Sequence, residues 1–344
     1  MRGCLSALAL LGTILASSPE GQAARVVTDS AGRQVEVPDR IERVFPAGPP
    51  AMVFLYVLVP ETLLGWTREF RGGEAAYVAA PYRQLPVPGR ITGRGGEANL
   101  EAVLAAEPDL ILDFGSVAPT HVSLADRVQA QTGVPYVLID GTFANTAPAL
   151  RLMGEILGVE ERAGKLARYT EATFGVIDML LGKVPRAERP RVYLARGPEG
   201  LETGVRGSIN TEIIERVGAV NVADAPGQRG IVNVSIEQVL LWNPEVVVTW
   251  DDRFYDRVRD DPFWQGTDAA RDGRVYLSPS EPFGWIDRPP SINRLLGMRW
   301  LASVLYPEQF QDDLRAMTRE FYALFYQVYL TDEQLDVLLA GAAR

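Results

Sequence analysis

The sequence predicts an α/β protein of two Rossmann-like lobes with parallel sheets, bridged by one long α-helix. Three observations support this prediction. Short apolar strands alternate with helices along most of the chain, which is typical of parallel sheets covered by helices. One long helical stretch lies near the middle, and a helix-strand unit of the first half has a counterpart in the second. The 344 residues also suit two domains better than one core.

The first half begins with a predicted hairpin over residues 25–37, whose turn is the Ser-Ala-Gly-Arg segment 30–33. Apolar runs that follow predict strands, and stretches with helical periodicity predict helices. The predicted strands are Arg43–Phe45, Thr62–Trp66, Asp109–Asp113 and Tyr136–Ile139, and the predicted helices are Pro49–Leu58, Leu100–Glu107, Leu124–Thr132 and Ala147–Leu157.

The predicted bridging helix covers residues 160–184 and would be roughly 37 Å long at 1.5 Å per residue. Pro185 and Pro190 end it. We therefore divide the chain into residues 1–23, an N-terminal lobe 24–159, the bridging helix 160–185 and a C-terminal lobe 186–344. In the second lobe we expect strands Arg191–Ala195, Glu245–Thr249 and Arg274–Leu277, and helices Thr211–Val217, Ile236–Trp242, Ile292–Leu305 and Gln309–Tyr329.

An internal repeat supports two similar lobes. In each copy a capping residue starts a short helix, a proline ends it, and an apolar strand follows. Glu101 and Glu237 are 136 residues apart in the two copies, as are Pro108 and Pro244. Ser235, with Gln238 three residues later, also has the spacing of a capping box.

Residues 1–23 have the features of a secretory signal peptide. Arg2 precedes an apolar run from Leu5 to Ala16, and small residues follow before Ala24. Cys4 lies before the apolar run, whereas a lipoprotein cysteine would follow it, so we do not expect a lipid anchor. Removal of this segment leaves no cysteine, because the chain has only one. A cysteine-free exported protein fits a bacterial periplasm.

Composition excludes several classes of function. The net charge is −10, which disfavours nucleic-acid binding through a global basic field. One His and one Cys exclude a zinc site built from several such ligands. Neither a Gly-x-Ser-x-Gly nucleophile motif nor a nucleotide-binding Gly-x-x-x-x-Gly-Lys-Ser/Thr loop is present.

Several segments resemble the substrate-binding proteins of bacterial ABC importers for ferric siderophores, haem and cobalamin. These segments are the opening Arg-Val-Val-Thr-Asp-Ser-Ala-Gly-Arg of residues 25–33, the paired helix-proline-strand units, the mid-chain helix and the helix that begins at Pro-Ser-Ile-Asn-Arg-Leu, residues 290–295. The resemblance implies a ligand cleft between two lobes and docking to an ABC permease dimer at the inner membrane. It also implies that Glu101 and Glu237 form salt bridges with permease arginines. We expect the binding protein to be a monomer.

The cleft residues are predicted from the rule that ligands bind beyond the carboxyl ends of strands in open α/β sheets. A long loop over residues 68–92 adds further candidates. Aromatic rings provide flat apolar contact area, and arginine binds carboxylate-bearing chelates through bidentate hydrogen bonds. The candidate ligand-binding residues are Trp66, Tyr77, Tyr82, Arg90, Arg94, Ser116, Phe143, Arg196, Arg206, Trp250 and Trp285.

The expected function is capture of a metal chelate, with iron the first choice, and its delivery to the permease. No enzymatic cofactor and no metal site formed by the protein alone are expected, since the single imidazole, His121, is assigned to a loop. The alternative is a metal chelatase on a related two-lobed scaffold, in which His121 and nearby carboxylates would be central. A chelate-binding sensor or adhesin is a third hypothesis.

Overall fold

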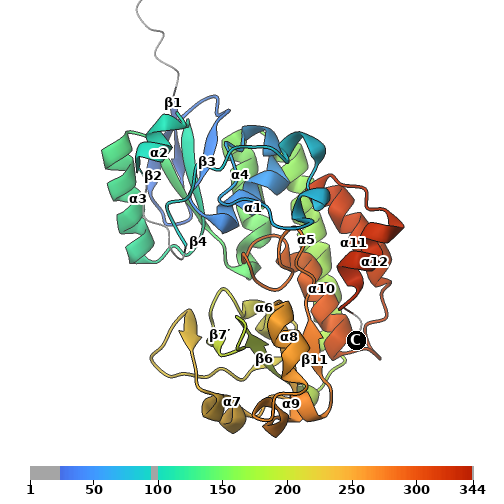
Figure 1. Cartoon of the computed structure of the whole chain (residues 1–344). Helices are drawn as coiled ribbons and strands as arrows, with labels where there is room; N and C mark the ends of the chain where they lie inside the picture. The colour runs from blue at the N-terminus through green and yellow to red at the C-terminus, as the bar shows by residue number, and fades with distance from the viewer. Residues whose placement is uncertain (1–23, 94–99, 343–344) are drawn as a thin grey trace, which may run out of the picture.

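The computed structural model of the chain describes residues 24–93 and 100–342. The expected signal peptide and Arg94 lie outside these residues. Two α/β lobes lie one above the other in Figure 1, and a long helix, α5 (Glu160–Leu181), runs along one side of both. The predicted fold class is therefore confirmed.

The N-terminal lobe contains a three-stranded parallel sheet in the order β3-β4-β5 and an antiparallel hairpin of β1 and β2. Its strands are β1 Ala24–Thr28, β2 Gln34–Pro38, β3 Val44–Pro46, β4 Leu110–Gly115 and β5 Tyr136–Asp140. Its helices are α1 Pro49–Leu58, α2 Leu100–Ala105, α3 Pro119–Thr132 and α4 Thr146–Leu157, with short 3₁₀ helices at Pro60–Thr62, Glu74–Tyr77, Ala80–Tyr82 and Phe143–Asn145.

The C-terminal lobe contains a four-stranded parallel sheet in the order β11-β10-β6-β8 and a small antiparallel pair, β7 and β9. Its strands are β6 Arg191–Ala195, β7 Glu202–Gly204, β8 Val220–Asn221, β9 Ile231–Asn233, β10 Val246–Thr249 and β11 Val275–Leu277. Its helices are α6 Glu212–Arg216, α7 Ile236–Trp242, α8 Asp252–Val258 and α9 Asp268–Arg271, with 3₁₀ helices at Arg186–Glu188 and Trp264–Gly266.

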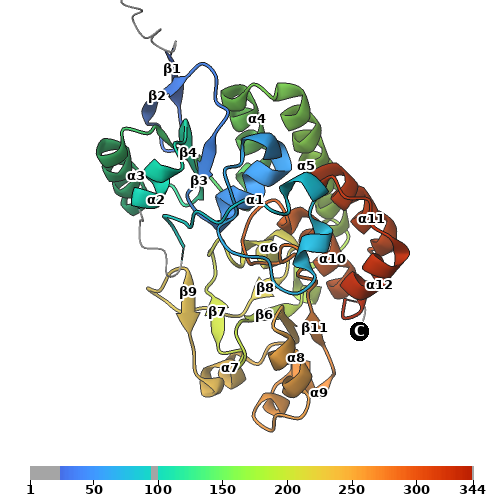
Figure 2. The same ribbon diagram turned by 45° about the horizontal axis from the view of Figure 1, so that its top comes forward.

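The chain closes with helices that pack beside α5. These are α10 Arg294–Leu305, α11 Leu314–Phe321, a π-helix Tyr322–Tyr326 and α12 Asp332–Leu339. Figure 2 shows the same group on the side of the molecule that joins the two lobes.

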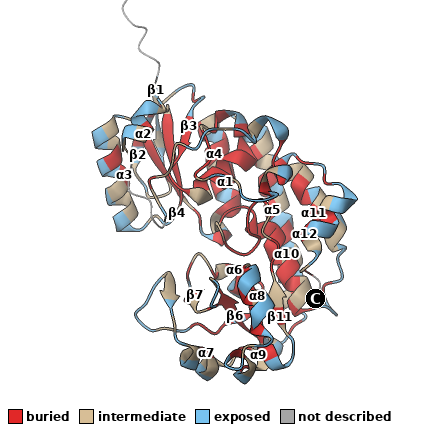
Figure 3. Cartoon of the chain, viewed as in Figure 1, coloured by how far each residue is buried: buried red, intermediate tan, exposed pale blue. Residues whose placement is uncertain are grey.

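One hydrophobic core continues through both lobes. On β6, Val192 and Leu194 belong to this shared core, whereas Tyr193 and Ala195 point to a separate core on the other face of the sheet. This alternation follows from the period of two along a strand. The buried residues coloured red in Figure 3 run from the upper sheet through α1 and α10. The lobes are thus connected by packed side chains as well as by α5.

The internal repeat is visible in the backbone. Glu107 and Asn243 occupy equivalent positions, and both have positive φ values, 45° and 41°. Few residues other than glycine adopt this left-handed conformation. In both copies it ends a short helix just before a proline and a buried strand. Only half of the expected capping box is formed, because Ser235 accepts a hydrogen bond from the Gln238 N–H without a reciprocal bond.

Three predicted elements were wrong. Residues 62–66 form a single bridge, from Leu63 to Val44, instead of a strand, because residues 85–88 cover them and the Trp66 N–H donates to the Pro86 carbonyl. His121 belongs to helix α3, which begins at Pro119, and not to a loop. The predicted helix over residues 309–329 starts only after Asp313, whose side chain caps α11, and it changes to a π-helix before ending.

Candidate functional site

Residues that follow β3 in the N-terminal lobe and β6 in the C-terminal lobe line a common cavity of about 400 Å³. Arg196 directly follows β6, and helix α1 follows β3 after Ala47 and Gly48. Two segments far apart in sequence complete the walls: the loop after Trp66 and the segment before α10. The lining residues are Pro49, Pro50, Met52, Thr67, Arg68, Arg71, Arg90, Gly93, Arg196, Asn210, Ile231, Phe283, Asp287, Arg288, Pro289 and Pro290.

Most of the charged side chains that line the cavity are basic. Five arginines line it, and Asp287 is the one acidic residue among the described lining residues. Helix α1 also begins there, and its first turn carries the positive end of the helix dipole. An acidic protein therefore concentrates positive charge at the point where its two lobes meet.

Two of the arginines are held by carboxylates. Arg68 makes a bidentate pair with Glu74, with N–O distances of 2.7 and 2.9 Å. Arg196 lies between two acids, with Nη1 2.9 Å from the Glu202 carboxylate and Nε 3.0 Å from the Asp287 carboxylate. Its side chain is 12% exposed, so the direction of this guanidinium is restricted.

Two other arginines have no such partners. Within residues 24–93 and 100–342, the guanidinium groups of Arg71 and Arg288 make no hydrogen bond or ion pair. Burial lowers the pKa of Arg288, and the positive charges of Arg68 and Arg71 lower it further, while the carboxylates of Glu74 and Asp251 oppose this shift. The cations in this cavity repel one another, so a bound anion would relieve that repulsion.

A second cavity, lined in part by Trp250, adjoins the first. The Trp250 ring lies 4.7 Å from the Arg288 guanidinium carbon and 5.9 Å from that of Arg196. The second cavity, about 510 Å³, is lined by Trp250 and residues of α8, and it shares Arg71 and Arg288 with the first. The indole N–H of Trp250 is buried and has no partner among the described atoms.

The structure brings together only some of the residues predicted to bind ligand. Arg90 and Arg196 line the main cavity, and Trp250 lines the adjoining one. Trp66, Tyr77, Phe143 and Trp285 instead pack in the hydrophobic core, where their rings stabilise the fold.

Other predicted site residues lie away from the cavity. Tyr82 donates a hydrogen bond to Glu61, Ser116 accepts one from the backbone of Ala118, and Arg206 pairs with Asp224 at 3.4 Å.

Sequence reasoning missed Arg71, Asn210, Asp287 and Arg288 as individual site residues. Arg71 lies in the long loop over residues 68–92 that is predicted to contribute to the cleft. Arg288 lies three residues after Trp285, the predicted ligand contact in this part of the chain, and precedes Pro289 and Pro290. Its backbone φ is 84°, an unusual value for a residue with a side chain, and such strain often marks functional sites.

The two glutamates expected to contact the permease are exposed and occupy equivalent positions. Glu101 lies in the first turn of α2, and Glu237 lies in the first turn of α7. A hydrogen bond from Ser235 lowers the pKa of Glu237, so this residue stays charged. Neither glutamate lines the cavity.

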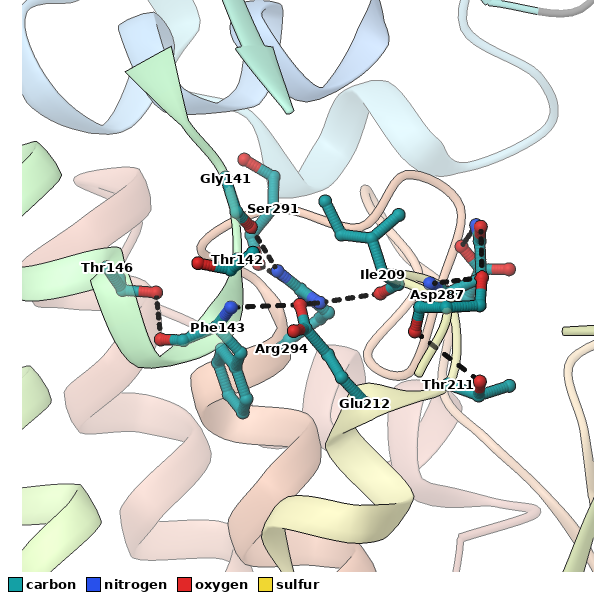
Figure 4. Close-up of polar contacts among 12 residues, drawn as sticks. Gly141, Thr142, Phe143, Thr146, Ile209, Thr211, Glu212, Asp287, Ser291 and Arg294 are labelled. Atoms are coloured by element: carbon teal, nitrogen blue, oxygen red, sulfur yellow. Dashed lines mark hydrogen bonds and ion pairs between the residues drawn. The ribbon is translucent and has the colours of Figure 1, made fainter. Parts of the chain in front are cut away.

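A buried arginine joins the two lobes beside the cavity. Arg294, the first residue of α10, is fully buried, and it donates to the carbonyl of Gly141 in the N-terminal lobe and to that of Ile209 in the C-terminal lobe. It also forms an ion pair of 2.6 Å with Glu212, which accepts a hydrogen bond from the Phe143 N–H (Figure 4). Burial raises the pKa of Glu212 and lowers that of Arg294, and the attraction between them opposes both shifts.

Comparison with known proteins identifies the class of protein to which this chain belongs. Residues 81–282 match the family described as periplasmic binding protein, and this chain belongs to that family. Members of this family and the similar solved structures are solute-binding proteins and not enzymes. Such proteins deliver solutes to the membrane permease of an ABC transporter. No helix among residues 24–93 and 100–342 has the length and apolar character needed to cross a bilayer.

Several relatives match almost the whole chain. The molybdate-binding protein MolA of Haemophilus influenzae is 27% identical, over 92% of this chain and 95% of the relative. An ABC transporter solute-binding protein from Sulfurospirillum deleyianum has a TM-score of 0.83 and 29% identity, covering 92% of this chain and 99% of its own. The molybdate-bound structure of MolA has a TM-score of 0.73 and 25% identity, covering 89% and 99%.

Proposed function

We propose that this protein captures a small, multiply charged oxyanion such as molybdate and delivers it to an ABC permease for import. The observation that carries the proposal is the set of five arginines around one cavity of about 400 Å³. Two of their guanidinium groups, on Arg71 and Arg288, have no bonded partner among the described residues. Cavities of this size are at the small end of the range for ligand sites.

The chemistry of the lining favours an oxyanion. Guanidinium groups bind oxyanions through pairs of parallel N–H···O bonds and remain charged at any physiological pH. Arg68, Arg71 and Arg90 approach from the N-terminal lobe, Arg196 from the C-terminal lobe and Arg288 from the segment before α10. An anion held by all three parts would draw the lobes together. The similarity to MolA, a protein named for molybdate binding, supports the same ligand class.

An iron chelate, the ligand expected from sequence, is the second candidate. The observation that favours it is the adjoining cavity of about 510 Å³, where the ring of Trp250 is available to an organic ligand group. A chelate with carboxylate groups would bind the shared residues Arg71 and Arg288 and extend over Trp250. The two candidates therefore differ in whether the adjoining cavity contributes to affinity.

Delivery would use Glu101 and Glu237, one on each lobe, as contacts for arginines of a permease dimer. The protein would act in the periplasm as a monomer, after export directed by residues 1–23 and without a lipid anchor. The equivalent positions of the two glutamates in the internal repeat support a partner with two similar halves.

Isothermal titration calorimetry of residues 24–344 tests the proposal. The panel contains molybdate, tungstate, sulfate, phosphate, ferric citrate, haemin and cobalamin. We expect saturable binding of a tetrahedral oxyanion, and we expect Arg71→Gln and Arg288→Gln each to weaken it about tenfold to a hundredfold, the loss of one or two charge-assisted hydrogen bonds. Arg206→Gln is the matched control, because this arginine lies outside the cavity.

The outcomes separate the two candidates. Binding of ferric citrate or haemin, lost in Trp250→Ala, would favour the chelate, whereas oxyanion binding that survives Trp250→Ala favours the first proposal. Absence of oxyanion binding, or equal effects of R206Q and R288Q, would overturn the oxyanion site.

A further inference from the structure

Asp287 is an unexpected residue in a cavity suited to anions. Its side chain is only 1% exposed, and the residue lines the same cavity as the five arginines. Considered as a charge alone, it repels an incoming anion and cancels part of the attraction of the arginines. A buried carboxylate at this position therefore needs a compensating role.

The contacts of Asp287 suggest that role. Oδ2 lies 3.0 Å from Arg196 Nε, while Oδ1 accepts hydrogen bonds from the Arg288 N–H at 3.0 Å and from Asn210 Nδ2 at 2.8 Å. One carboxylate thus contacts the side chain of one cavity arginine and the backbone of another. The bond to the Arg288 N–H also holds this residue in its strained backbone conformation, at φ 84°.

These contacts continue to the junction between the lobes. Asn210, which donates to Asp287, follows Ile209, whose carbonyl accepts a hydrogen bond of 2.8 Å from Arg294. Arg294 in turn donates to the Gly141 carbonyl of the N-terminal lobe at 3.0 Å. Figure 4 shows Asp287 on one side of Ile209, with Arg294 and Gly141 on the other. The position of Asp287 is therefore tied to both lobes.

We propose that Asp287 is a positioning residue for anion capture, which directs Arg196 and Arg288 toward the bound oxyanion. Asp287 holds the guanidinium group of Arg196 and the backbone of Arg288 in place. The benefit exceeds the repulsion between this carboxylate and the anion, because pre-organised groups lose little conformational entropy on binding. This inference rests on the proposed function, and it makes a prediction opposite in sign to that of simple electrostatics.

The test is Asp287→Asn, titrated with molybdate at fixed ionic strength. Removal of a negative charge from the cavity wall would tighten anion binding if charge alone mattered. We expect the reverse, a loss of about tenfold or more in affinity, equivalent to ~1.4 kcal/mol. Stopped-flow measurements should show this loss mainly as faster dissociation, because the long-range attraction that governs association is not reduced.

Asp224→Asn is the matched control, since it removes the same charge from the exposed partner of Arg206. It should leave molybdate affinity unchanged. Near-UV circular dichroism verifies that each variant folds. Asn210→Ala, at a half-buried position, removes a hydrogen bond to Asp287 and keeps the charge of Asp287. We expect this variant to bind molybdate more weakly. The double variant N210A/D287N should lose no more affinity than D287N alone.

Each outcome is decisive. Tighter or unchanged molybdate binding by D287N overturns the positioning role while leaving the oxyanion function intact. If D287N does not fold, unchanged affinity in N210A overturns the positioning role. If the parent protein binds no oxyanion, the proposed function fails, and this inference fails with it.

Discussion

Replacement of Arg294 by Met should destabilise the protein strongly, because it breaks the buried junction between the lobes. The arginine is fully buried and bonds to Gly141, Ile209, Ser291 and Glu212. Methionine fills similar space but leaves the Glu212 carboxylate without its counter-ion. Removing one partner of a buried ion pair costs about 3–5 kcal/mol, so we expect the free energy of unfolding to fall by that amount.

The deficit should depend on pH. Burial already raises the pKa of Glu212, and in R294M the opposing attraction of the arginine is lost, so that pKa rises further. A carboxyl with a higher pKa in the folded state than in the unfolded state binds more protons when folded. Stability therefore falls as pH rises above the ordinary glutamate pKa of about 4.3. The difference between R294M and the parent should be larger at about pH 8 than at about pH 5.

Urea unfolding, followed by tryptophan fluorescence and far-UV circular dichroism, measures this effect. Glu212→Gln in the R294M background should recover part of the loss, because it removes the unpaired charge and keeps an acceptor for the Phe143 N–H. Arg151→Met breaks an exposed bidentate pair with Glu171 and should have a much smaller effect. A deficit for R294M below ~1 kcal/mol that is the same at both pH values would refute this reasoning.

The remaining predictions concern backbone packing and permease docking. Gly297→Ala would place a Cβ 1.8 Å from the Trp285 carbonyl oxygen, so it should displace the segment that carries Asp287 and lower both stability and anion affinity in the same titrations. Gly175→Ala, in an open position of α5, should instead raise the free energy of unfolding by about 0.5–1 kcal/mol; a stable G297A or a destabilised G175A would contradict this comparison. Glu101→Ala combined with Glu237→Ala should leave anion affinity unchanged while cellular uptake is lost, since both residues are exposed and outside the cavity. Reduced affinity in this double variant would place the glutamates in the ligand site instead.

The sequence was sufficient for the elements whose signals are local. Helices α1 and α7 and strand β6 have the predicted bounds, because prolines, capping residues and apolar runs mark both of their ends. The repeat was also recoverable, since a helix, a proline and a strand recur at one spacing. Its most specific feature is the positive φ at Glu107 and Asn243. Asparagine adopts this conformation more readily than most residues but glutamate does not, so the proline that follows is the one local signal the two copies share.

The aromatic site residues show where local reasoning failed. Trp66 and Trp285 each lie within three residues of residues that line the cavity. The position of a residue along the chain does not reveal the direction in which its side chain points. In the structure the Trp66 ring packs against Tyr56 and Phe283, and Trp285 is buried in the same hydrophobic core. Burial of a large apolar surface is more favourable than its exposure in a polar cleft.

By itself, the sequence determined the class of fold, the bridging helix, the repeated lobes and the general position of a cleft at the strand ends. Only the tertiary structure decided which side chains meet there. Arg68, Arg196 and Arg288 come from three distant parts of the chain, and the interaction that orders them runs through Asp287 and Asn210. The physical reason is that hydrogen-bonded turns and periodic burial are local properties, whereas a charged cavity depends on contacts between residues far apart in the sequence, such as Asn210 and Asp287, which are 77 positions apart.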